Sequence, residues 1–600
     1  MIQNDPKRSK MIQSGVCRFL HSCCILTIYS YLTGVLLLAS ITKKTIKGKS
    51  YYYVVETKRV DGKPRIVSQI YLGKIDDIVR KVTEPPKPQS VKTRQFGITA
   101  ALMSIVEKLG LIKLIDDIFI KREHGASLGQ YMLVAAINRC SDPTSKSKIG
   151  EWYEETILPR ILGIEPKYLT SQRFWDNMCL ITDKNLTEIK TKLAQRVIDT
   201  YDIDLSTLLY DATNFFTFID TNNSCTIPQR GHNKQKRNDL RQISFSLMVS
   251  KDGAVPILYD VYQGNENDSV QFDKFIRNLI GEFKSIFTNC DDITIVCDKG
   301  NNSKDNLNLI LDSSFHLISS LSPTHCKELL DIPLIEYKSC KHQRLVDEKY
   351  YHTTYKVLNK DDVTVVCVYN PELYYGQLQG IYNNIRKAQK ELNNIRENLQ
   401  AWLRGEINKG KRPTAKGVEL KVKKSISRQY IKDVFKYDVI EIDGFVDMEY
   451  CLDNKAFEKL KNTLLGKTIL YTDRKDWHPE DIILAYRDQY AIEHAFRQMK
   501  DPSWVSWDPN FHWTDQKIKV HAFYCYLSLL LSTLLRRELT NLGLNYSIST
   551  ALEKLSKIQE VSISYASNRR QQMPDVVVVG DMDSKQNTIY KALDLERFTL

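Results

Sequence analysis

The sequence predicts an α/β protein in which a mixed sheet with flanking helices follows a helical region and is interrupted by a β-containing insertion. Three observations predict this fold class. Short runs rich in β-branched and aromatic residues begin near Leu205. The segment before them has apolar residues at helical spacing. With 600 residues, 42% of them hydrophobic, the chain has enough apolar surface for several cores, which excludes collagen-like and wholly disordered proteins.

The first 46 residues differ from the rest of the chain. Residues 1–50 contain eight Lys and Arg residues and one acid, so about half of the net charge of +13 lies there. Residues 25–41 are a mostly apolar run that is compatible with a short membrane anchor, a secretory signal or sequence upstream of the natural start. We expect the last of these, and therefore no membrane association. The odd total of 13 cysteines, without a CxxC pair, is typical of thiols in a reducing cytoplasm, where we expect the protein.

Residues 47–95 predict a β-hairpin module and a linker. The runs 51–60 and 65–73 read as strands joined by a glycine turn, and the proline-rich residues 84–88 read as a stiff boundary. Residues 96–203 predict a helical region, in which Thr170 and Ser171 begin one of the helices. Such a region either reads DNA ends or only packs against the core.

The predicted core begins at residue 204 with strands at 206–218, 241–250 and 254–265, a helix at 269–283 and a strand at 292–298. Asp211 ends an apolar run, and Asp298 ends another. A carboxylate at the exit of a buried strand is costly unless it caps a helix or binds a cation, so two such residues in one sheet suggest a shared ion. Either aspartate alone is more simply a turn residue.

Residues 326–475 predict an insertion of strands, one long helix and a basic stretch. Apolar residues from Leu378 to Trp402 recur at alternating steps of three and four, which predicts a heptad seam that packs within its own domain or forms a dimer. Residues 404–436 contain eleven Lys and Arg residues against three acids, so they form either a solvated surface or a track for DNA phosphates. A smaller basic cluster around Lys236 and Arg237 leaves the same two alternatives.

Residues 480–500 predict one helix. Tyr486, Glu493 and Lys500 are spaced by seven, close to two helical turns, and therefore share a stripe with Tyr490 and Arg497. The stripe is either a surface on which Glu493 pairs with Arg497 or a metal-binding glutamate flanked by phosphate-binding groups.

These residues resemble the DDE transposases of bacterial and archaeal insertion sequences, in the group with a Tyr-x2-Arg-x3-Glu-x6-Lys signature. Tyr486, Glu493 and Lys500 occupy the Tyr, Glu and Lys positions, Asp211 in YDAT matches the first aspartate, and Asp298 in VCDKGNNSKDNL matches the second. Gln489 stands at the Arg position, where Arg487 or Arg497 is the alternative phosphate contact. The resemblance runs from about residue 47 to at least residue 560.

The resemblance implies an RNase H-like catalytic core in which Asp211, Asp298 and Glu493 bind two Mg²⁺ ions, or Mn²⁺, and catalyse phosphoryl transfer. It implies cleavage at the ends of a mobile element and transfer of the 3′ ends to target DNA, without a small-molecule substrate and by a homodimer in the DNA complex. The residues assigned to DNA phosphates are Tyr486, Gln489, Arg497, Lys500, Lys299, Lys236 and Arg237. Two alternatives remain: an inactive or domesticated DNA-binding protein of the same fold, and a membrane-anchored nuclease.

The predicted boundaries are an extension at 1–46, the hairpin module at 47–95, the helical DNA-binding region at 96–203, the first part of the core at 204–325, the insertion at 326–475, the last part of the core at 476–545 and a C-terminal region at 546–600.

Overall fold

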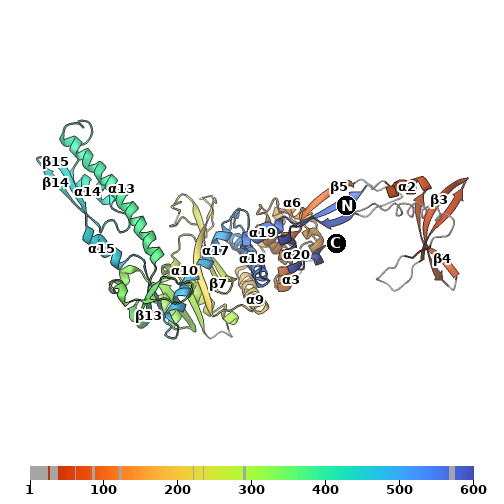
Figure 1. Cartoon of the computed structure of the whole chain (residues 1–600), viewed down its shortest axis with the longest axis horizontal. Coiled ribbons are helices and arrows are strands. Elements are labelled where there is room, and N and C mark those ends of the chain that lie inside the picture. The colour runs from red at the N-terminus through yellow and green to blue at the C-terminus, as the bar shows by residue number, and fades with distance from the viewer. Residues whose placement is uncertain are drawn as a thin grey trace, which may run out of the picture. The chain divides into compact units, whose positions relative to one another are not determined.

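A computed structural model describes residues 25–27, 38–60, 63–83, 88–119, 125–220, 222–233, 235–287, 292–565 and 575–599. The chain divides into two compact units (Figure 1). Unit 1 comprises residues 1–92 and 561–578, and unit 2 comprises residues 93–560 and 579–600. The functional residues expected from the sequence all belong to unit 2.

Unit 1 contains a four-stranded antiparallel sheet of order β1-β2-β3-β4, made by Ile25–Thr27, Leu38–Ile46, Lys49–Val60 and Lys63–Gly73, followed by α2 (Ile75–Thr83). The β3–β4 pair confirms the predicted hairpin. Strand β2 ends at Ile46, where we expected a boundary, and pairs with β3 along its whole length. Most of the apolar run 25–41 and of the linker 84–88 lies outside the described residues.

The helical region of unit 2 is confirmed between residues 97 and 201. Thr170 caps α8 as expected, since its side chain accepts a hydrogen bond from the backbone N–H of Arg173. The helices are α3 (Gly97–Leu109), α4 (Leu111–Asp116), α5 (Leu128–Ser141), α6 (Ile149–Glu154), α7 (Leu158–Leu162), α8 (Ser171–Met178) and α9 (Asp183–Tyr201).

Helix α18 (Asp515–Asn541) is the central helix of unit 2, and it packs against α3, α5 and β8. Among the described residues it is the one helix long and apolar enough to cross a membrane, but 94% of its most apolar window is buried inside the protein. A helix that is apolar on all sides is expected in a protein interior. Its composition is therefore explained by packing.

The core of unit 2 is a mixed sheet of nine strands, in the order β11-β12-β13-β16-β10-β9-β6-β7-β8. Strands β6, β9 and β10 run parallel to one another, whereas β7 and β8 are antiparallel to their neighbours. The strands are β6 (Thr207–Thr217), β7 (Arg241–Ser250), β8 (Pro256–Gln263), β9 (Ile293–Cys297), β10 (Phe315–Ser320), β11 (Lys338–Ser339), β12 (Lys349–Val357), β13 (Lys360–Tyr369) and β16 (Lys467–Thr472). Helices α10 (Asp268–Ile280), α11 (Lys304–Leu311) and α12 (Lys327–Leu330) follow or separate these strands.

The insertion is smaller than the sequence suggested. Strands β11, β12, β13 and β16 fall within the predicted range 326–475, yet they extend the main sheet. Among the described residues of this range, those of a separate hydrophobic core lie between Ile381 and Leu465. The physical reason is that the buried strand β13 pairs with β12 on one side and with β16 on the other. Strand β16 in turn pairs antiparallel with β10 of the core, so these strands join the main sheet.

The long helix of the insertion, α13 (Pro371–Leu403), buries the predicted heptad seam within its own domain (Figure 1). Its buried seam residues join one core with α14 (Ala415–Ser425), the hairpin of β14 (Phe435–Ile442) and β15 (Phe445–Leu452), and α15 (Asn454–Thr463). The turn between β14 and β15 uses Asp443 and Gly444, both with positive φ, as tight hairpins require. Of the two alternatives for the seam, packing within the chain is confirmed.

The C-terminal part of the chain contains α16 (Pro479–Arg487), α17 (Tyr490–Met499), α19 (Ile548–Ser556) and α20 (Ser584–Ala592). Three further strands, β5 (Pro88–Gln95), β17 (Gln559–Tyr565) and β18 (Val576–Val579), form a sheet of order β18-β17-β5.

Candidate functional site

Asp211 lies within strand β6, which continues to Thr217, and not at the end of a strand as we expected. The expectation failed because β6 is longer than its parallel neighbour β9. Its pairing with β9 stops at Tyr210, whereas its pairing with β7 continues to Thr217. Side chains alternate along a strand, so Asp211, Thr213 and Phe215 share one face of β6. Asp211 is half-buried there.

Asp298 is the first residue after β9, as predicted, and its side chain is exposed. Its Oδ1 accepts a hydrogen bond of 2.7 Å from the backbone N–H of Lys299, which starts a single 3₁₀ turn. Tyr210 of β6 lies opposite Cys297 of β9 in parallel register, so the next residue on each strand is an aspartate. Asp211 and Asp298 therefore leave the paired region at the same edge.

Tyr486, the last but one residue of α16, contacts Asp298. Its hydroxyl lies 2.9 Å from Ser320 Oγ and 3.3 Å from Asp298 Oδ1. Burial raises the pKa of Tyr486, and the Asp298 carboxylate raises it further. The phenol therefore stays protonated at neutral pH and is the donor to Asp298, since a carboxylate only accepts.

Helix α17 packs against β6 and β7 and brings Lys500 to the face of β6 that carries Asp211. The Lys500 ammonium lies 2.5 Å from Thr213 Oγ1 and 5.4 Å from the ring centroid of Phe215. Glu493 is exposed on the same helix, two turns or about 10 Å before Lys500 along the axis. The helix that carries the predicted glutamate thus lies over the strand of the first predicted aspartate.

The predicted single helix 480–500 is wrong, because α16 ends at Arg487 and α17 begins at Tyr490. Asp488, at the break, is buried and forms ion pairs with Arg344 at 2.5 Å and Lys251 at 3.6 Å. These partners belong to distant segments and hold the break in place. The stripe from Tyr486 to Lys500 is therefore divided between two helices.

The residues around the expected Arg position have different surroundings. Arg487 forms a bidentate ion pair with buried Glu348, so its guanidinium already has an anion. The side-chain nitrogen of Gln489 is buried and has no hydrogen-bond partner among the described residues. Arg497 is exposed, and no ion pair joins it to Glu493 in the described part of the chain. Arg497 is thus the more available of the two alternative cations.

The donor chemistry of the three acids fits Mg²⁺, which prefers carboxylate oxygens. Asp211 and Asp298 lie at one edge of the sheet, and Glu493 is exposed on α17, which packs against β6 and β7. Within the residues that the structure describes, however, no three His, Cys, Asp or Glu side chains are close enough to hold a metal ion together. The assignment of Asp211, Asp298 and Glu493 to one metal site stays a prediction.

The remaining predicted phosphate contacts lie on the surface. Lys299 and Lys236 are exposed. Arg237 is bound to Asp239 at 2.8 Å, and this contact lowers the pKa of Asp239 to about 2. Lys234, from the same basic cluster, lies outside the described residues. Lys236 is consequently an exposed cation among the described residues of this cluster.

Three residues near the site were missed from the sequence. Ser320 ends β10, the third parallel strand, and the strand-end pattern that singled out Asp298 was present there too. Trp507 stacks on Phe215 of β6, with ring centroids 4.2 Å apart and planes 6° apart. Neither Trp507 nor Glu348 has a sequence signal, because their partners are far away in the chain.

Comparisons with known proteins complete this picture. Comparison with curated proteins gives no match. Among solved structures, the chain is similar to one described as the cryo-EM structure of a piggyBac transposase synaptic complex with hairpin DNA. The TM-score is 0.35 at 8% identity, over 78% of this chain and 82% of the other. The model of the transposase DDE domain matches residues 206–531, from the start of β6 into α18 and more than half of the chain. The chain therefore belongs to the transposase DDE domain family.

Proposed function

We propose that the protein is a transposase that cleaves DNA at the ends of a mobile element and joins the 3′ ends to target DNA. One observation supports this most strongly. Asp211 and Asp298 follow paired residues of two parallel strands, and the helix that carries Glu493 packs on one of those strands. Membership of the transposase DDE domain family, whose model spans all three residues, supports the same proposal.

Asp211, Asp298 and Glu493 would hold divalent ions, two Mg²⁺ or Mn²⁺. Bound there, such ions activate water or a 3′-hydroxyl and neutralise charge on the leaving oxygen. The protein's own groups orient these ligands. Tyr486 donates to one oxygen of Asp298, and the N–H of Lys299 donates to the same oxygen. The other carboxylate oxygen, Oδ2, is therefore the one left to face a cation.

Lys500 is the proposed phosphate contact nearest the acids. Its ammonium reaches Thr213, two residues after Asp211 on the same face of β6. A lysine there acts as a point charge that positions a phosphate without reading sequence. Arg497, exposed on the same helix, is the proposed second contact.

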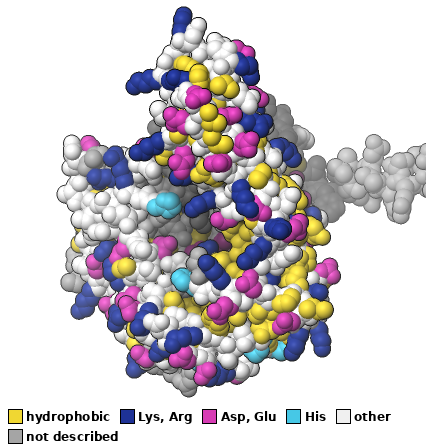
Figure 2. All heavy atoms as spheres, turned by 90° about the vertical axis from the view of Figure 1, so that its left-hand side faces the viewer, with side chains coloured by type: hydrophobic (Ala, Val, Ile, Leu, Met, Phe, Trp, Pro, Cys, Tyr) yellow, Lys and Arg dark blue, Asp and Glu magenta, His cyan; other side chains and the backbone are white. Residues whose placement is uncertain are grey.

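The basic stretch 404–436 is the proposed track for the DNA backbone. Several of its cations are neutralised by neighbours: Arg404 by Glu406, Lys423 by Glu419, and Arg428 by Glu391. Others are exposed and form no ion pair among the described residues; these are Lys409, Lys411, Lys416, Lys421, Lys424 and Lys432. Figure 2 shows Lys and Arg side chains projecting from the upper part of the molecule, with acids between them. Unpaired lysines of this kind suit phosphate contacts.

The type of core fold, the group of transposases and the oligomeric state are also proposals. The order β8-β7-β6-β9-β10, with three parallel central strands, supports an RNase H-like core. The Tyr, Glu and Lys spacing from Tyr486 to Lys500 supports the group found in bacterial and archaeal insertion sequences. We also propose that the protein acts as a homodimer on paired DNA ends, in the cytoplasm.

Cleavage of DNA tests the function. The substrate is a plasmid that carries the ends of the element encoding this chain, incubated with Mg²⁺ and, separately, with EDTA. We expect Mg²⁺-dependent nicking that falls at least a hundredfold in Asp211→Asn, Asp298→Asn and Glu493→Gln, since each removes a ligand charge. Glu397→Gln, an exposed acid of α13 outside the basic stretch, is the matched control and should cleave normally. Cleavage that persists in all three variants contradicts the site, whereas DNA binding without any cleavage by the wild type supports an inactive DNA-binding protein.

A further inference from the structure

Two neighbouring cavities lie between the helical region and the segment that leads into α18. One has a volume of about 180 Å³ and the other about 320 Å³. They share three wall residues, Trp175 of α8, Phe511 and His512. We call the pair the aromatic cradle. None of the proposed catalytic residues lines it.

The cradle exposes three large aromatic side chains. Trp175 is 39% exposed, Phe511 64% and Trp513 65%. The Lys517 ammonium lies 4.9 Å above the Trp175 ring. Isolated exposed aromatics are ordinary, but three in one depression mark a binding surface. Flat rings beside a cation are the groups that stack on nucleic-acid bases.

A buried cation lies in the wall of the smaller cavity. Lys146 is only 9% exposed and donates a hydrogen bond of 2.7 Å to the Tyr524 hydroxyl. No carboxylate in the described part of the chain forms an ion pair with it. Burial lowers the pKa of Lys146, and nearby Arg139 lowers it further. Burial therefore disfavours the charged ammonium, and an anionic group bound in the cavity would favour it.

His512 adds a second unsatisfied group. It is 6% exposed, lines both cavities, and its Nδ1 has no hydrogen-bond partner among the described residues. Its Nε2 lies 3.3 Å from the Tyr524 hydroxyl. The Tyr524 hydroxyl therefore contacts both Lys146 and His512, a residue in the wall of the cradle.

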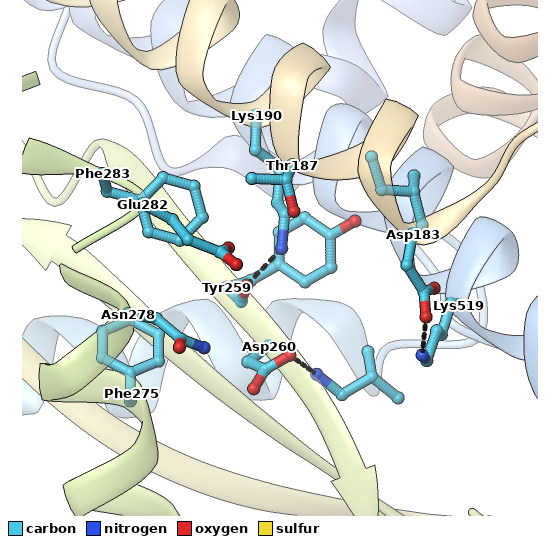
Figure 3. Close-up of a pocket in the computed structure, with 12 residues that line it drawn as sticks. Asp183, Thr187, Lys190, Tyr259, Asp260, Phe275, Asn278, Glu282, Phe283 and Lys519 are labelled. Carbon is cyan, nitrogen blue, oxygen red and sulfur yellow. Dashed lines mark hydrogen bonds and ion pairs between the residues drawn. The ribbon is translucent and has the colours of Figure 1, made fainter. Parts of the chain in front are cut away.

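The charge of the cradle distinguishes it from another cavity of unit 2. No aspartate or glutamate is among the described residues that line either part of the cradle. The other cavity, of about 230 Å³, is lined by Asp183, Asp260 and Glu282 as well as Lys190 and Lys519 (Figure 3). Lys519 is paired with Asp183 at 2.7 Å, and Lys190 faces the carbonyl of Tyr259. That cavity thus combines three acids with two lysines, whereas the described residues that line the cradle include lysines without acids.

We propose that the aromatic cradle binds one unpaired nucleotide of a DNA strand. Its base stacks on Trp175, Phe511 and Trp513, and its phosphate is held by Lys146 and Lys517. This inference rests on the proposed function, because it presumes a DNA substrate. The cradle is also linked to the catalytic sheet: its segment continues from Trp507, which stacks on Phe215 of β6.

Binding of oligonucleotides to the full-length protein in EDTA tests the cradle without cleavage. The probes are a dT12 strand with one 2-aminopurine, a blunt duplex of the same length, and free dTMP as competitor. We expect Trp513→Ala and Lys517→Ala each to weaken binding of the single strand about tenfold, as loss of one stacked base does. Binding of the blunt duplex should change less than twofold, and free dTMP should not compete at the strand's concentration.

Two further variants make the result specific. Trp513→Phe should restore most of the affinity, because a flat ring remains. Phe218→Ala, which removes a phenylalanine that is 85% exposed on another segment, is the matched control and should bind normally. Equal loss for duplex and single strand, competition by dTMP, or unchanged binding in both Trp513→Ala and Lys517→Ala overturns the inference. If plasmid cleavage fails but cradle binding persists, the proposed function fails alone; if cleavage succeeds without cradle binding, the cradle fails alone.

Discussion

The hydroxyl of Tyr486 lies 3.3 Å from Oδ1 of Asp298, which joins the end of α16 to the end of β9 across 188 residues of chain. The same hydroxyl is 2.9 Å from Ser320 Oγ at the end of β10. Tyr486 and the backbone N–H of Lys299 thus fix the direction of an exposed carboxylate together. This contact gives Tyr486 an effect on the site that does not depend on DNA.

Tyr486→Phe should slow DNA cleavage about tenfold, since a hydrogen bond to a charged group contributes roughly 1.5–3 kcal/mol. The free energy of unfolding should change by less than about 1 kcal/mol, because the ring remains packed. Cleavage rates and urea unfolding measure the two effects. Tyr375→Phe, on an exposed residue of α13, is the control. An unchanged rate in Tyr486→Phe would show that Asp298 needs no orientation by this hydroxyl.

Glu348→Ala should lower the free energy of unfolding by about 2–3 kcal/mol, because Arg487 loses its anion in a largely buried position. The side chain of Glu348 is 5% exposed and that of Arg487 is 31% exposed, which places the effect at the low end for buried pairs. Urea unfolding followed by tryptophan fluorescence measures it. Glu406→Ala breaks an exposed, solvent-screened pair and should change the free energy of unfolding far less than Glu348→Ala does. Equal effects in the two variants contradict a structural role for Arg487.

Leu392→Ala should destabilise the insertion by about 2–5 kcal/mol, because Leu392 is fully buried in the core around α13. Hydrogen exchange along α13 and β15 should report the loss. The size of the particle in solution should stay the same, since the seam is covered by the chain itself. Glu397→Ala, on the exposed side of α13, is the control. A change in oligomeric state would instead indicate that the seam is an intermolecular interface.

The protein should lose stability as the pH falls below about 6.5, the ordinary value for histidine. Burial lowers the pKa of His521 and His512 well below that value, so in this range the unfolded chain binds protons that the folded protein does not. The free energy of unfolding therefore rises with pH and falls on acidification. His521 accepts from the Tyr524 hydroxyl and donates to the Trp507 carbonyl at 2.8 Å, a pattern that requires the neutral ring.

His521→Asn tests this dependence. Asparagine supplies a donor and an acceptor without titrating, so the variant should be less stable at every pH but should show a shallower decline between pH 7.5 and 5.5. Urea midpoints at several pH values give the slopes. His494→Asn, on an exposed histidine of α17, should leave the slope as in the wild type. A slope that is unchanged in His521→Asn would assign the acid sensitivity to other groups.

Much of the core was predictable because its signals are local. The apolar run before Asp298 and the alternating run through Asp211 gave β9 and β6, and the heptad seam gave α13. A buried face can be recognised from the sequence of one segment alone, since the period of the hydrophobic pattern matches the period of the helix or strand. The neighbouring positions of the two aspartates, in contrast, follow from the parallel register of β6 and β9.

The sequence by itself thus determined the strands, the long helix and the aspartates that the strands carry. Only the tertiary structure decided which groups remain available around them. Arg487 is bound by Glu348 from 139 residues away, and buried Asp488 binds Arg344 from 144 residues away where α16 and α17 part. The tertiary structure also decided what covers the seam of α13, which packs against α14 and β15. Ion pairs and packing between distant segments leave no periodic signal in the chain, so the helix break and the choice between Arg487 and Arg497 appear only when those segments meet.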